Sequence, residues 1–151
     1  MLRYLKVNAM KNLLYLIVMC LLVSCEIMGT EPPQENETDP ATVMSVSEAL
    51  QSAGSKDVWV IGHIVGGDLS SSSASYEPPF TSKTCILIGA EYPVSSRDSC
   101  MSVQLPAGKV RDALNLADNP ELLGTKVIIK GDVTTSYYGL VGLKSCDDYR
   151  L

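Results

Sequence analysis

The chain has 151 residues and a net charge of −5, from 12 basic and 17 acidic side chains, and 46% of its residues are hydrophobic. This length is enough for one domain of ordinary size and not for several. The acidic balance argues against tight binding to a phosphate backbone, which relies on clustered lysine and arginine.

Residues 1–24 are typical of a bacterial lipoprotein signal peptide. Basic residues come first, and residues 13–23 then form an unbroken apolar run. That run is shorter than the roughly 20 residues that a membrane-spanning helix needs, and it fits the hydrophobic region of a secretory leader. The Leu-Val-Ser-Cys tetrapeptide that ends at Cys25 resembles a lipobox. We therefore expect cleavage before Cys25 and lipidation of its thiol, which would anchor the mature chain through two or more acyl chains.

Two alternatives are an ordinary signal peptide that happens to contain a cysteine and an uncleaved N-terminal anchor. Under the lipoprotein interpretation, the chain is an outer-membrane lipoprotein, on the periplasmic face or at the cell surface. Acidic residues soon after Cys25 resemble the surface-export signals of Bacteroidetes lipoproteins.

Residues 25–40 are predicted to be an acidic, proline-containing tether. They hold five carboxylates, three prolines and no periodic apolar pattern, a composition that cannot build a packed core and that extends by charge repulsion. Without the leader, 9 basic and 17 acidic residues remain, a net −8, of which residues 41–151 carry −3. We expect the tether to hold one folded domain, residues 41–151, away from the membrane.

The folded domain is predicted to begin with a short helix and a strand. Ser45 can cap a helix that ends at Gly54, and Glu48, three residues after the cap, completes a capping box. Residues 58–65 are apolar and β-branched, which predicts a strand. A long loop with a serine run at 70–73 follows this strand.

One further helix and four further strands are predicted beyond the long loop. Apolar residues recur at i, i+3 and i+4 within 108–116, which predicts a helix with one buried stripe. The remaining elements are strands at 84–88, 102–105, 126–133 and 140–144, with a turn at 137–139.

This order predicts a mainly β fold, a five-stranded OB-like (oligonucleotide/oligosaccharide-binding) Greek-key barrel with a helix between strands three and four and a short N-terminal helix. Gly62 and Gly131 support closure into a barrel, because a glycine inside a strong strand marks a bulge or a sharp bend. A β-sandwich and an open α+β sheet share this order of elements and are the alternatives.

Several blocks of the domain resemble an uncharacterised OB-like domain of secreted Bacteroidetes lipoproteins. The resemblance covers nearly the whole domain, from about Val46 to Tyr149, and implies the OB-like fold and a binding role without an established activity. The serine-rich loop is a local elaboration of the pattern. The blocks fall in order at 58–66, 103–106, 110–116, 119–120, 124–127, 130–132, 138–139 and 142–144.

Three cysteines remain once Cys20 leaves with the leader and Cys25 is lipidated. An odd number in an exported chain means one disulfide and a free thiol, an intermolecular bond, or no disulfide. We prefer a disulfide between Cys85 and Cys100, which lie on neighbouring predicted strands, with Cys146 left over. No metal site is expected, because the sequence has no Cys-x-x-Cys motif and its single histidine, His63, has no nearby ligand in the sequence.

Aromatic and polar side chains are predicted to gather on the outer face of the barrel. Alternation along a strand places Trp59 and His63 on the outer side of the first barrel strand and Lys130 on that of the fourth. OB-like barrels bind ligands by stacking them on aromatic rings. The alternative is that the N-terminal helix or the long loop covers Trp59 as a second small core. The candidate ligand face is Trp59, His63, Lys130, Tyr137 and Tyr138, with Tyr76 and Phe80 from the long loop.

No sequence motif for a serine hydrolase, a zinc protease or a P-loop is present. His63 is the one side chain suited to proton transfer near pH 7. Because it is not accompanied by any of these motifs, we expect no catalytic residue and no cofactor. The first hypothesis is a membrane-anchored cell-envelope lipoprotein whose non-catalytic domain binds a protein partner or a glycan. The alternatives are an extracellular module for single-stranded nucleic acid, which the charge disfavours, and an enzyme of unrecognised type.

Overall fold

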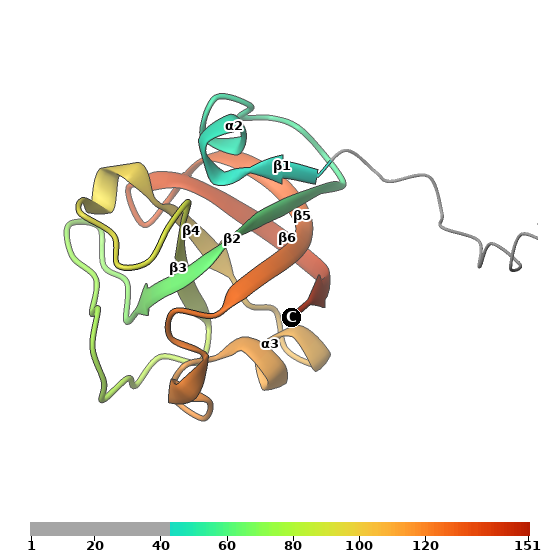
Figure 1. Cartoon of the computed structure of the whole chain (residues 1–151). Coiled ribbons are helices and arrows are strands. Elements are labelled where there is room, and N and C mark those ends of the chain that lie inside the picture. The colour runs from blue at the N-terminus through green and yellow to red at the C-terminus, as the bar shows by residue number, and fades with distance from the viewer. Residues whose placement is uncertain (1–42) are drawn as a thin grey trace, which may run out of the picture. The chain divides into compact units, whose positions relative to one another are not determined.

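The structure is a computed structural model that describes residues 43–151, so the predicted leader, Cys25 and the whole of the predicted tether lie outside the described residues. Strands dominate the described part, and two short α-helices and two 3-10 helices join them (Figure 1). In chain order the elements are β1 (Val43–Ser45), α2 (Val46–Leu50), β2 (Val58–Gly67), β3 (Cys85–Gly89), η1 (Arg97–Ser99), β4 (Met101–Gln104), α3 (Lys109–Leu114), η2 (Pro120–Leu122), β5 (Lys126–Tyr137) and β6 (Leu140–Arg150).

Five strands close into a barrel in the order β2-β3-β4-β6-β5, and β5 pairs back onto β2. β4 and β6 are parallel, and the other neighbours in the ring are antiparallel. α3 lies between the third and fourth strands of the ring in the sequence, and α2 precedes the first. The predicted OB-like barrel is therefore confirmed.

The two strand glycines have different roles in closing the barrel. At Gly131 the β5–β6 register shifts between Lys130 and Asp132, and a Cβ at Gly131 would lie 2.7 Å from the carbonyl oxygen of Lys144. This glycine therefore sits at a bulge, as predicted. Gly62 keeps a regular register with β5, and a Cβ there would lie 2.7 Å from Val46 of α2. Gly62 therefore allows α2 to pack closely against β2. It does not form the predicted bulge, since the bulge of β2 lies further along the strand, between Ile64 and Gly66.

The main core fills the barrel between the two helices, which lie at opposite ends of it (Figure 1). α2 contributes Val46 and Ala49, and its predicted capping box forms, since Ser45 Oγ accepts the N–H of Glu48 and the Glu48 carboxylate accepts the N–H of Ser45. α3 contributes the apolar stripe expected from its spacing. The inward side chains that the helices cover are Val60, Ile64, Ile86, Ile88, Met101, Val103, Val127, Ile129, Val133 and Leu143.

A second buried cluster lies on the outer face of β2 and β3, with Cys100 just before β4 and Leu140 at the start of β6. Alternation sends Ile86 and Ile88 of β3 into the barrel, so Cys85 and Leu87 point outward, and yet all four are buried. The loop between β2 and β3 contributes Leu69 to this cluster. We call the cluster the outer apolar cluster; its buried members are Val65, Leu69, Cys85, Leu87, Cys100 and Leu140.

β1 was not expected from the sequence. Its three residues pair in parallel with β2, with Val43 opposite Trp59 and Ser45 opposite Ile61. Three residues are too few to show an alternating pattern, so the backbone pairing is visible only in three dimensions. β5 and β6 also extend beyond their predicted ends, to Tyr137 and Arg150.

Candidate functional site

Trp59 is the centre of a four-stranded surface formed by β1, β2, β5 and β6. Its cross-strand partners are Val43 on β1 and Lys130 on β5, and Lys130 in turn pairs with Asp148 on β6. Directly paired residues lie on the same face of a sheet. Trp59 is half-buried, and the guanidinium of Arg150 lies over its indole ring at 4.6 Å from the centroid, within cation–π range.

The next row across the same strands is more apolar. Ile61 pairs with Ile128, and Ile128 pairs with Arg150. Both isoleucines are half-buried, and Val43 at the edge is 40% exposed. We call this surface the Trp59 wall; it consists of Val43, Trp59, Ile61, Ile128 and Arg150.

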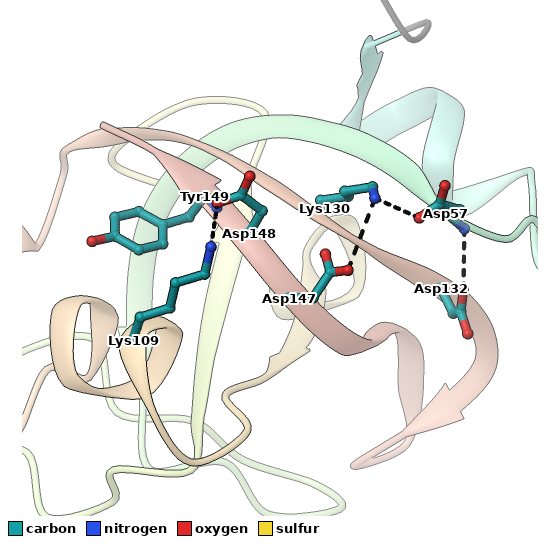
Figure 2. A network of polar contacts seen from close by, with 7 residues as sticks. All are labelled: Asp57, Lys109, Lys130, Asp132, Asp147, Asp148 and Tyr149. Atoms are coloured by element: carbon teal, nitrogen blue, oxygen red, sulfur yellow. Dashed lines mark hydrogen bonds and ion pairs between the residues drawn. The ribbon is translucent and has the colours of Figure 1, made fainter.

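Ion pairs frame the Trp59 wall, and Figure 2 shows most of them. Lys130 Nζ lies 2.7 Å from a carboxylate oxygen of Asp57 and 3.8 Å from one of Asp147. The hydrogen bond that Lys130 donates to the Asp57 carboxylate is the main reason that the pKa of Lys130 is raised. Further along, Lys109 Nζ lies 2.9 Å from Asp148, and this bond lowers the pKa of that carboxyl. These pairs neutralise charges next to the Trp59 wall, since Lys130 is the cross-strand neighbour of Trp59.

Asp132 anchors the segment that leads into β2. Its carboxylate accepts the backbone N–H of Asp57 at 3.1 Å and pairs with Lys56 Nζ at 3.0 Å. The bond from the Asp57 backbone, followed by that from Lys56, lowers the pKa of Asp132. Asp57 has a positive φ of 55°, so this carboxylate also holds a backbone conformation that non-glycine residues rarely adopt.

His63 lies on the same strand as Trp59 but further along it, opposite Lys126 of β5. Its Nδ1 is 3.3 Å from the carbonyl oxygen of Ala90. Among residues 43–151, this is the one hydrogen bond that the His63 side chain makes, and no carboxylate or hydroxyl group is bonded to the imidazole. The arrangement orients the imidazole without building a catalytic pair.

Tyr137 and Tyr138 lie at the turn between β5 and β6, seven residues beyond Lys130 and therefore about 23 Å along the strand. Their ring centroids are 4.6 Å apart. Tyr137 packs against the outer apolar cluster, and burial raises its pKa to about 12. Tyr138, with a positive φ of 51°, is 36% exposed.

The five predicted face residues therefore do not form one stacking surface. Trp59 and Lys130 are direct neighbours, His63 lies at a second place, and the two tyrosines lie at a third. Of the loop aromatics, Phe80 is buried in the main core and Tyr76 is 37% exposed.

The predicted disulfide between Cys85 and Cys100 is wrong in this structure, because both are free thiols, as is Cys146. The register gives the reason. Cys85 pairs with Gln104, and Ile88 with Met101, so the two cysteines sit at opposite ends of the β3–β4 ladder, about 13 Å apart at 3.3 Å per residue. A disulfide needs Cα atoms within about 7 Å.

Two arginines were missed from the sequence. Arg150 reaches Trp59 because β6 continues beside β5 as far as Arg150. The sequence predicted this strand only for residues 140–144, so it gave no reason to place Arg150 near Trp59. Arg97 donates to backbone carbonyls on two other loops, contacts that have no local sequence signal.

Residues 43–151 contain no group of three or more metal-ligating side chains positioned to share an ion. Across the same part of the chain, no helix is both long and apolar enough to cross a bilayer.

The fold and the Trp59 wall together define an OB-like barrel domain with a mixed aromatic and charged outer surface. Residues 44–151 match a family described as a domain of unknown function, DUF6359. The match spans most of the sequence, so the chain belongs to this family. No curated protein and no solved structure matches the chain.

Proposed function

We propose that the chain is a membrane-anchored lipoprotein of the cell envelope whose OB-like barrel is a non-catalytic domain that binds a protein partner through the Trp59 wall. The lipobox-like sequence that ends at Cys25 supports the anchor. The resemblance of the acidic residues after Cys25 to the export signals of Bacteroidetes lipoproteins supports an outer-membrane location. The anchor and the binding surface are separate parts of the proposal and are tested separately.

The observation that carries the binding role is the pairing of a half-buried Trp59 with the Arg150 guanidinium at the centre of a surface containing Ile61 and Ile128. Tryptophan and arginine are the side chains most enriched at the energetic centres of protein interfaces. The ion pairs of Lys130 and Lys109 lie beside this pair, and polar residues commonly surround the apolar centre of an interface. This combination favours a protein partner over a nucleic acid, whose backbone requires unpaired basic side chains.

A glycan is the second candidate, and a different place in the fold favours it. Tyr138 in the β5–β6 turn is 36% exposed and Tyr76 in the β2–β3 loop is 37% exposed, and the same turn and loop meet where Gly139 approaches Ser71. Serine hydroxyls of residues 70–73 lie on the same loop and supply donors and acceptors. The two candidates use different residues and so can be distinguished.

The test of the binding role uses residues 26–151 and envelope vesicles from cells that lack the gene. Binding is measured for the wild-type chain, for Trp59→Ala and for Tyr138→Ala, with vesicles left intact, treated with protease or oxidised with periodate. We expect saturable binding that is lost with Trp59→Ala and with protease and is kept with Tyr138→Ala and after periodate. Loss with Tyr138→Ala and periodate would instead identify a glycan, and no binding by any of the three proteins would contradict the proposal.

The anchor is tested with Cys25→Ala in the full chain. We expect the wild-type protein in the membrane fraction with incorporated fatty acid, and the variant without label and no longer released as a mature lipoprotein. Equal fatty-acid incorporation by both proteins would contradict lipidation at Cys25.

A further inference from the structure

Arg97 connects three loops that are distant in the sequence. Its Nη2 donates one hydrogen bond to the carbonyl oxygen of Ser70, at 2.9 Å, and another to that of Tyr138. Arg97 begins η1 between β3 and β4, Ser70 lies between β2 and β3, and Tyr138 lies in the β5–β6 turn. One guanidinium therefore holds all three loops together.

The loop between β2 and β3 has a fixed base and a separate tip. At the base, Asp68 accepts the backbone N–H of Thr81 at 3.0 Å, and Ser75 exchanges two 2.9 Å hydrogen bonds with Gly67. At the tip, residues 70–73 form a compact turn closed by hydrogen bonds between the first and last serines. Because the base is held without Arg97, the tip can change position while the base stays in place. We call residues 68–82 the cover loop.

The tip also meets the β5–β6 turn directly. Gly139 has a φ of +77°, and a Cβ at this position would lie 2.6 Å from the carbonyl oxygen of Ser71. Only glycine permits both this backbone conformation and this close approach. The closed position of the tip is therefore a specific fit between two loops.

The cover loop lies over the outer apolar cluster. Leu69 belongs to the cluster and Ala74 packs against it, one on each side of the tip. Beneath them, Leu87 and Cys100 are completely buried although they point away from the barrel interior. Without the cover, the outer face of β2 and β3 would present these side chains to water.

Few polar contacts hold the tip closed. Both hydrogen bonds from Arg97 go to neutral carbonyl oxygens. Arg97 forms no ion pair among residues 43–151, since the basic partner in each ion pair there is a lysine. The Nε atom of Arg97 is buried without a hydrogen-bond partner, which disfavours the closed arrangement. Besides the packing of Leu69 and the fit against Gly139, the hydrogen bonds that tie the tip to the other loops come from Arg97, whose own hydrogen bonding is incomplete.

We propose that Arg97 is a clasp on a hinged cover: when its two carbonyl bonds are lost, the tip of the cover loop swings away and the outer surface of β2 and β3 changes from polar to apolar. Arg97 acts here as a positioning residue, and the device does not depend on what binds the Trp59 wall. Opening would give the domain a second surface whose exposure is controlled by one side chain.

The test uses the free cysteines as reporters in the full chain, purified in detergent. Maleimide labelling followed by peptide mapping gives a separate rate for each thiol. Cys100 lies in the outer apolar cluster beside η1, whereas Cys146 lies in the main core and is the internal control. The variants are Arg97→Ala, Arg97→Lys and, as a control for removing a cation elsewhere, Lys83→Ala, which breaks an exposed ion pair with Asp118.

We expect Arg97→Ala to raise the labelling rate of Cys100 at least tenfold and to leave that of Cys146 unchanged. Arg97→Lys should fall between the wild type and Arg97→Ala, because one ammonium group cannot reproduce the planar fork of the guanidinium. Burial raises the pKa of Cys100 and the charge of Arg97 partly offsets this rise, so loss of that charge by itself would slow labelling, not speed it.

A variant of the β5–β6 turn distinguishes opening of the tip from a local gap left by the missing Arg97 side chain. Gly139→Ala keeps Arg97 but places a Cβ 2.6 Å from the carbonyl oxygen of Ser71, so it should also raise Cys100 labelling without changing that of Cys146. Because the hydrogen bonds of the Ser70 and Ser73 amides lie within the tip, hydrogen exchange at these amides should stay unchanged if the tip swings as a unit. Unchanged Cys100 labelling in Arg97→Ala, or faster labelling in Arg97→Ala but not in Gly139→Ala, would overturn the proposal. So would an equal rise at Cys100 and Cys146, because it would show global unfolding.

Discussion

The contact between Trp59 and Arg150 is the residue-scale feature on which the binding proposal depends. The guanidinium covers one face of the indole, so it both shields the ring and holds it in position. We predict that Arg150→Ala shifts the fluorescence emission of Trp59 to longer wavelength and lowers the free energy of unfolding by about 0.5–1 kcal/mol, the usual range for an exposed cation–π pair. Lys83→Ala, which removes a cation that pairs with Asp118 and not with Trp59, should leave the emission unchanged. An unshifted spectrum in Arg150→Ala would show that the two side chains do not pack in solution.

A second residue-scale prediction concerns the bulge in β5. A Cβ at Gly131 would meet the backbone carbonyl of Lys144 at 2.7 Å, whereas one at Gly67 would meet side chains only, those of Phe80 at 3.3 Å and Leu116 at 3.5 Å. Backbone cannot move aside as a side chain can, so Gly131→Ala should destabilise the domain by about 1–3 kcal/mol, the cost typical of overpacking. Gly67→Ala should cost clearly less. Urea unfolding of both variants tests this order, and equal losses would contradict the assigned bulge.

At the scale of elements, Asp132 links β5 to the segment that leads into β2. Hydrogen bonds from the Asp57 backbone and from Lys56 lower the pKa of Asp132 below its value in the unfolded chain. The stabilisation is therefore present above about pH 4, the ordinary pKa of an aspartate, and is lost as the pH falls through the lowered pKa of the folded state.

We predict that Asp132→Asn is less stable than the wild type at neutral pH and that the difference shrinks below about pH 4. Urea unfolding at a series of pH values measures it. Asp112→Asn, at an exposed carboxylate of α3 that makes no ion pair among the described residues, is the matched control and should track the wild type. A difference that stays constant down to pH 3 would contradict the pKa assigned to Asp132.

Local signals in the sequence were sufficient for most elements. Ser45 and Glu48 form the capping box that their spacing predicts, and the apolar stripe of α3 packs as expected. The strand order could be inferred because a helix between the third and fourth strands is characteristic of this barrel. β1 could not, since its pairing partner, not its composition, makes it a strand.

The candidate site was less predictable because it depends on register. Alternation correctly placed Trp59 and Lys130 on one face, but the distance from Lys130 to Tyr137 follows from the length of β5. One available signal pointed to the outer apolar cluster. The run Cys85-Ile86-Leu87-Ile88 is apolar without alternation, which is typical of a strand buried on both faces.

At the scale of the whole domain, the barrel has two outer surfaces of different character. The Trp59 wall is formed by β1, β2, β5 and β6, whereas the outer face of β2 and β3 lies under the cover loop. The alternative in which a loop makes a second small core is therefore correct in kind, but the core surrounds Leu87 and not Trp59. We therefore propose the Trp59 wall, and not the covered face, as the surface for a protein partner.

The most direct measurement uses the fact that the sequence contains one tryptophan. Incorporation of 5-fluorotryptophan gives residues 26–151 a single fluorine resonance, which is recorded by NMR as unlabelled envelope protein extract is added. We predict a saturable shift or broadening of this resonance that disappears when the extract is digested with protease. A resonance that stays unchanged while the chain binds the envelope would contradict recognition through the Trp59 wall.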